Sequence, residues 1–137
     1  MDDCWACNIK FMNEITGLIE KGTRVGSKIS YPTINVVIDR DDSLSGVYVC
    51  DVEVGVGGDH KKVFGAGYVG EKDLLPKGKF ICEVFLFGDF GELYGEMVRV
   101  KLLHKIRDVQ KIKNLEELSA LISNDVKEAK KWLELNV

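Results

Sequence analysis

Apolar and polar residues alternate along much of the chain. In GVYVCDVEV, residues 46–54, every second side chain from Tyr48 onward is apolar, whereas Asp51 and Glu53 point to the opposite face. Such alternation is typical of a half-buried strand, and the flexible GVGGDH at residues 55–60 predicts a hairpin turn after it. Similar runs recur at the short intervals of an antiparallel all-β domain, at about 11–19, 33–38, 46–54, 62–69, 79–87 and 93–103.

The period becomes helical after Asn114. Asn114 with Glu117 three residues later forms a start that resembles a capping box. The pattern predicts a helix from about residue 115 to 134 that lays one apolar stripe on the β-body, formed by Leu115, Leu118, Ile122, Val126, Ala129 and Leu133.

Six strands followed by one helix predict a small barrel or sandwich that a C-terminal helix closes. A closed barrel would remove the exposed edges that short strands otherwise leave. We expect residues 1–137 to form a single domain, with a leader at 1–10, the barrel at 11–103 and the helix at 114–134.

The charge balance excludes some classes of partner. Nineteen Lys and Arg against 22 Asp and Glu give a net charge of -3, which argues against general binding to nucleic acid or to an anionic membrane. No apolar run reaches the length of a membrane span, and the acidic Asp2 and Asp3 differ from the basic start of a secretory signal. We therefore expect a cytoplasmic protein, and a monomer.

The four cysteines do not form a recognisable metal site. Cys4 and Cys7 have redox or zinc-knuckle spacing, but no second such pair exists and both histidines are isolated, so two incidental thiols on a leader are the favoured interpretation. Cys50 and Cys82 fall inside apolar strand runs, where free cysteine behaves as a small hydrophobe.

Polar residues interrupt two of the strand runs. In YPTINVVI, residues 31–38, Asn35 sits inside a β-branched run that Pro32 and Thr33 precede, although asparagine is depleted in strands and proline cannot donate to a ladder. In KFICEVFLF, residues 79–87, Glu83 shares a face with apolar side chains, where the pKa of a carboxylate rises unless the group is partnered. An outward face that reaches water explains Glu83 equally well.

Two loops carry basic residues. The first is EKGTRVGSKISYPT, residues 20–33, where Gly22 and Gly26 let backbone N–H groups approach an anion and Arg24 and Lys28 add positive charge. Such a loop can cover a phosphate. Arg107 lies in LLHKIRDVQKIKN, after the sixth strand run, where a charged residue can reach a ligand. A solvated turn and a plain surface loop remain the simpler explanations of the two.

In order along the chain, these pieces resemble the riboflavin kinase (flavokinase) family. The resemblance covers residues from about Ile15 to Leu133, and the whole set in this order is far more specific than any one segment. It implies a six-stranded antiparallel Greek-key barrel with a C-terminal helix. The matching segments are PTIN (32–35), SGVYVCDVEV (45–54), EVFLF (83–87), GELYGEMVRV (91–100), HKIRD (104–108) and NLEELSALISNDVKEAKKWL (114–133).

The resemblance also implies a reaction, in which the ATP γ-phosphate passes to the 5′-hydroxyl of riboflavin and gives FMN and ADP. It makes Glu83 the catalytic carboxylate and gives Mg²⁺, or another divalent cation, the ligands Thr33 and Asn35. The glycine–lysine loop, with Gly22, Arg24, Gly26 and Lys28, would cover the nucleotide phosphates, and the loop at Arg107 would close over the flavin. Because only about fourteen residues precede the first strand, we expect a monofunctional kinase without an adenylyltransferase domain.

Departures from the family pattern lie near the loops that would cover the two substrates, among them Ser30, Ile34, Val109 and Ile112. They motivate an alternative, a non-catalytic flavin- or nucleotide-binding module on the same barrel.

Overall fold

The computed structural model describes residues 13–20, 31–55, 61–71, 79–88 and 95–137. The predicted leader, with Cys4 and Cys7, lies outside these residues. Within them the chain forms six strands, a short 3-10 helix and one α-helix: β1 (Asn13–Leu18), β2 (Thr33–Ile38), η2 (Asp42–Leu44), β3 (Gly46–Val54), β4 (Lys61–Glu71), β5 (Phe80–Leu86), β6 (Met97–Arg107) and α1 (Leu115–Asn136).

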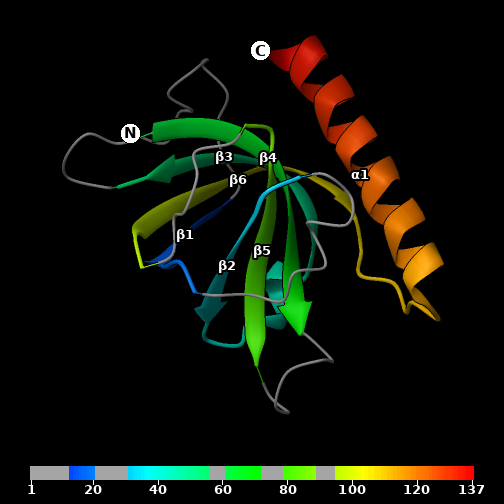
Figure 1. The fold of residues 1–137 in the computed structure, drawn as a ribbon, viewed down its shortest axis with the longest axis horizontal. Helices are drawn as coiled ribbons and strands as arrows, with labels where there is room; N and C mark the ends of the chain where they lie inside the picture. The colour runs from blue at the N-terminus through cyan, green and yellow to red at the C-terminus, as the bar shows by residue number, and fades with distance from the viewer. Residues whose placement is uncertain (1–12, 21–30, 56–60, 72–78, 89–94) are drawn as a thin grey trace.

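The six strands form one antiparallel sheet in the order β1-β6-β3-β4-β5-β2 (Figure 1). Consecutive strands β3, β4 and β5 are neighbours, while β2 returns beside β5 and β6 beside β3, as in a Greek key. The two ends of the sheet meet where the Glu20 N–H donates to the Asn35 carbonyl oxygen, at 2.7 Å. The predicted barrel with a C-terminal helix is therefore confirmed.

Alternate side chains of the strands fill the barrel interior. This cluster includes Cys50 and Cys82, both fully buried, which confirms that they pack as small hydrophobes. Burial raises the pKa of the Cys82 thiol to about 12, with the charge of Glu83 as a smaller cause. Burial also raises the pKa of the Cys50 thiol well above its usual value.

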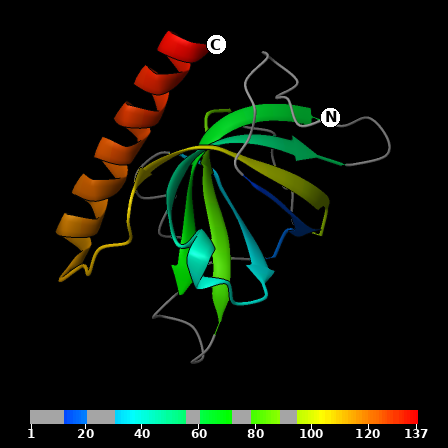
Figure 2. The ribbon, with the colours of Figure 1, turned by 180° about the vertical axis from the view of Figure 1, so that it is seen from behind.

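A second apolar cluster joins the outer face of the sheet to α1, where outer means pointing away from the barrel interior. Figures 1 and 2 show the helix alone on one side of the barrel. The buried members of this second cluster are Val49, Ala66, Phe85, Leu103, Ile122, Val126 and Ala129. No helix among the described residues is long and apolar enough to cross a lipid bilayer.

The helix begins as the sequence predicts. The Asn114 side-chain oxygen accepts a hydrogen bond from the Glu117 N–H, at 2.8 Å, and the helix continues to Asn136. The sixth strand, by contrast, extends beyond the predicted end at residue 103. Register shifts in its pairing with β3 skip Leu103 and Ile106, which turn toward α1, and pairing resumes as far as Arg107.

Candidate functional site

Asn35 on β2 lies directly opposite Glu83 on β5. Directly opposed residues of an antiparallel pair share a face, so both side chains lie on the outer face, and Thr33 joins them opposite Phe85. The β2 residues on either side of Asn35 face inward and pack in the barrel core. The structure thus brings together Thr33, Asn35 and Glu83, which we call the β2–β5 site.

Local sequence explains how β2 reaches this position. Pro32 precedes the strand, where its missing N–H costs nothing, and its carbonyl oxygen accepts the Leu86 N–H at 2.8 Å. Asn35 is only 6% exposed, and its backbone carbonyl forms the bond from Glu20 that closes the sheet. An asparagine in a β-branched run is therefore accommodated because its backbone completes the ladder while its side chain faces the site.

The glycine–lysine loop begins at this same place. Of its flanking residues, Glu20 bridges to Asn35, and Tyr31 lies two residues before Thr33. The predicted phosphate-binding residues of the loop lie outside the described residues: Gly22, Arg24, Gly26 and Lys28.

The chemical character of the β2–β5 site suits a hard cation. Thr33 offers a hydroxyl oxygen, and Asn35 an amide oxygen, and Mg²⁺ prefers oxygen ligands together with retained waters and phosphate oxygens. Glu83 is half-buried, with Tyr68 opposite it on its other side, on β4. In the described part of the chain, no group of three or more His, Cys, Asp or Glu side chains could hold a metal ion.

Arg107 lies on the same face but at a distance from Glu83. The paired residues run from Arg107 through Val47 and Tyr68 to Glu83, three strand spacings, or about 14 Å along the sheet. Its Nε and Nη2 donate to the two carboxylate oxygens of Asp125 on α1, both at 2.8 Å, and its Nη1 donates to the Asp108 carbonyl at 3.0 Å.

These three bonds leave two of the five guanidinium N–H groups of Arg107 without a partner among the described residues. The structure therefore places Arg107 at the end of β6, anchored to the helix, rather than in a loop.

Beside the β2–β5 site, two aromatic side chains and a lysine form a group that the sequence alone does not indicate. Tyr31 and Phe87 meet edge to face, with ring centroids 6.2 Å apart, and the Lys130 ammonium of α1 lies 5.3 and 5.2 Å from the two centroids. Lys130 also donates to the Tyr31 hydroxyl at 3.2 Å. A lysine on the polar face of a helix carries no sequence signal for such a contact, because the contact depends on where the helix docks.

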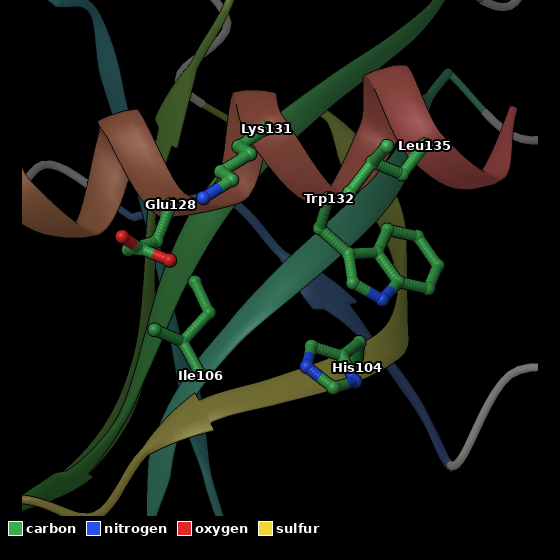
Figure 3. A pocket seen from close by; sticks show the side chains of 6 residues that line it. All are labelled: His104, Ile106, Glu128, Lys131, Trp132 and Leu135. Carbon is green, nitrogen blue, oxygen red and sulfur yellow. The ribbon is translucent and has the colours of Figure 1, made fainter.

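A small cavity lies between α1 and β6 (Figure 3). Its volume is about 190 Å³, and its wall includes His104 and Trp132, whose rings stack with centroids 5.3 Å apart and planes 11° apart. Glu128 and Lys131 line it as well. None of its lining residues belongs to the β2–β5 site, so the cavity is separate from the predicted chemistry.

Known proteins resemble this chain over nearly all of its length. It is 31% identical over 118 residues to the bifunctional riboflavin kinase/FMN adenylyltransferase of Haemophilus influenzae. This match covers 85% of this chain and 37% of that relative. A crystal structure described as a macrolide-efflux protein from Streptococcus pneumoniae has a TM-score of 0.67 at 30% identity, over 87% of this chain and 38% of that one.

A second solved structure supports the fold. Riboflavin kinase from Trypanosoma brucei superposes with a TM-score of 0.63 at 19% identity, over 88% of this chain and 76% of that one. Residues 9–133 match the flavokinase family, described as riboflavin kinase. The match spans most of the chain and includes both strands of the β2–β5 site, so this chain belongs to the riboflavin kinase family.

Proposed function

We propose that the chain is an ATP:riboflavin 5′-phosphotransferase, which converts riboflavin and ATP to FMN and ADP. The observation that carries this proposal is the register of β2 on β5. It sets Asn35 opposite Glu83 and puts Thr33 on the same face, in a chain that belongs to the riboflavin kinase family. A carboxylate that can accept a proton, beside two neutral oxygen ligands that can hold a divalent cation, suits the transfer of a phosphoryl group to a hydroxyl.

Glu83 acts as the general base. Its carboxylate accepts the proton of the attacking 5′-hydroxyl, and its half-buried position limits the water that would compete for the carboxylate. Thr33 and Asn35 hold the divalent cation through oxygen atoms. When bound, Mg²⁺ neutralises charge on the phosphate oxygens.

The remaining predicted residues bind the two substrates. Gly22, Arg24, Gly26 and Lys28 contact the nucleotide phosphates; Glu20, at one end of their loop, pairs with Asn35, and Tyr31, at the other end, lies two residues before Thr33. Arg107 contacts the flavin through the two N–H groups that Asp125 and Asp108 leave, and the Asp125 carboxylate fixes the plane of the guanidinium. Its distance of about 14 Å from Glu83 places this contact away from the reacting hydroxyl.

Purified protein incubated with riboflavin and MgATP tests the proposal through FMN formation, followed by chromatography. We expect Glu83→Gln to lower kcat by about 10²- to 10⁴-fold, which is the usual contribution of a positioned base. Glu53→Gln is the matched control, because Glu53 is another half-buried outer-face carboxylate whose partners Arg99 and Lys62 lie on β6 and β4.

Three outcomes decide between the hypotheses. The proposal is supported if the wild type and Glu53→Gln form FMN while Glu83→Gln shows the expected loss of kcat. Quenching of riboflavin fluorescence without FMN formation would instead favour a non-catalytic binding module. Near-normal turnover of Glu83→Gln removes Glu83 from the role of base while leaving the kinase activity in place.

A further inference from the structure

Lys130 on helix α1 contacts two aromatic side chains at the start of β2 and the end of β5. Lys130 lies over the rings of Tyr31 and Phe87, at 5.3 and 5.2 Å, and donates to the Tyr31 hydroxyl at 3.2 Å. A cation and the face of an aromatic ring attract one another electrostatically, so one ammonium that contacts two rings holds both rings in place. Both rings also pack against the apolar cluster between the sheet and α1.

The aromatic pair lies next to the last residue pair of the β2–β5 ladder. Thr33 pairs with Phe85; Tyr31 lies two residues before Thr33, ahead of β2, and Phe87 two residues after Phe85, just past β5. Between them the Pro32 carbonyl accepts the Leu86 N–H at 2.8 Å. Both rings pack against the cluster between the sheet and α1, which puts them on the outer face, and an extended chain puts Tyr31 about 7 Å from Thr33.

The position of Tyr31 has a consequence for the site. Tyr31 directly follows the glycine–lysine loop in sequence, and only Pro32 separates it from Thr33. Proline fixes one backbone dihedral angle, so the direction of the chain at Tyr31 is passed on to Thr33 with little freedom between them.

We propose that Lys130 is a positioning residue of the kinase, which holds Tyr31 and thereby sets Thr33 for the metal-bound nucleotide. The proposal rests on the function proposed above. It assigns Lys130 no contact with substrate. Loss of its charge therefore weakens binding of MgATP and leaves binding of riboflavin nearly unchanged.

The decisive comparison is Lys130→Met against Lys127→Met. Methionine keeps an unbranched stem and helix propensity while removing the ammonium, and Lys127 is an exposed lysine of the same helix. We expect Lys130→Met to raise the KM for MgATP by about threefold to tenfold, because only part of the free energy of the cation–π contacts is passed on to the position of Thr33. The KM for riboflavin changes less than twofold, and Lys127→Met behaves as the wild type.

Two further measurements separate positioning from a general loss of structure. Lys130→Arg keeps a cation and donors for the same rings and restores the KM for MgATP. Hydrogen exchange at the backbone amides of Tyr31 and residues 33–35 becomes faster in Lys130→Met than in Lys127→Met. Equal rises in both KM values, or amide exchange that does not differ between the two variants, would overturn the inference.

The design also separates this inference from the proposed function. If the wild type forms no FMN, the proposed function fails, and amide exchange at Tyr31 and residues 33–35 decides whether Lys130 holds this segment. If the wild type is active and Lys130→Met matches Lys127→Met in both measurements, the kinase stands and the inference fails.

Discussion

The ion pair between Arg107 and Asp125 ties the end of β6 to the helix, and its removal gives a measurable loss of stability. Both hydrogen bonds are 2.8 Å long, and the side chains retain 19% and 6% of their exposed surface. Asp125→Ala leaves Arg107 largely buried without its anion. Because the guanidinium keeps some exposure and the Asp108 carbonyl, we expect a cost of about 2–3 kcal/mol, below the range for fully buried pairs.

The opposite variant is more damaging. Arg107→Ala leaves the more deeply buried partner, Asp125, as an uncompensated carboxylate, so we expect a loss of about 3–4 kcal/mol. Removing both partners leaves no orphaned charge, and the double variant should lose less than the two single variants combined. We expect a coupling free energy of about 2 kcal/mol, which corresponds to a loss of about 3–5 kcal/mol in the double variant.

Urea unfolding of the four proteins, followed by far-ultraviolet circular dichroism, measures this cycle. Equal m-values across the set show that the same surface is exposed in each. A coupling free energy below about 0.5 kcal/mol would refute the reasoning, because it would make the pair equivalent to an exposed surface pair. The same variants also test the proposed contact between Arg107 and the flavin, since Asp125→Ala retains the guanidinium. A KM for riboflavin that rises in Arg107→Ala far more than in Asp125→Ala supports that contact.

Three further variants test the packing of the barrel and the helix start. A Cβ at Gly17 would meet Val36 Cγ1 at 2.6 Å, so Gly17→Ala should cost about 1–3 kcal/mol in urea unfolding, and should cost less in a chain that already carries Val36→Ala. Burial raises the pKa of the Cys82 thiol to about 12, whereas the pKa of the same thiol in the unfolded chain is near 9.0. The free energy of unfolding therefore falls as pH rises above 9, by up to about 1.4 kcal/mol per pH unit from this thiol, and Cys82→Ala should give a flatter slope. Asn114→Ala removes the helix cap and should cost about 1 kcal/mol; an unchanged melting temperature would argue against the cap.

Much of the fold could be predicted because its strands obey a simple period. In β3 the alternation of apolar residues with Asp51 and Glu53 identifies the strand. The helix start at Asn114 follows from local capping chemistry. Both features depend on residues close together in sequence, which is why single-sequence reasoning identifies them.

The end of β6 shows where this reasoning stops. The pairing of β6 with β3 skips Leu103 and Ile106, and these two residues turn toward α1. A skipped residue breaks the two-residue period, so the alternation indicates an end at residue 103 although pairing continues to Arg107. Only the partner strand and the helix, distant in sequence, make the continuation favourable.

The candidate site divides in the same way. Asn35 and Glu83 each stand out locally as a polar residue in an apolar strand run. That they lie opposite one another is a property of strand register, which neither segment specifies alone. Lys130 shows no local anomaly, because a lysine on an exposed helix position is ordinary.

Asn35 joins the closure of the barrel to the chemistry of the site. Its backbone carbonyl accepts the bond from Glu20 that brings the two ends of the sheet together, while its side chain lies on the outer face opposite Glu83. The bond that closes the sheet therefore also holds one end of the glycine–lysine loop beside the proposed metal ligands. Because this bond uses only backbone atoms, it constrains the position of residue 35 and not its side chain. The pairing therefore does not itself require asparagine at this position, which is consistent with the proposed metal ligand.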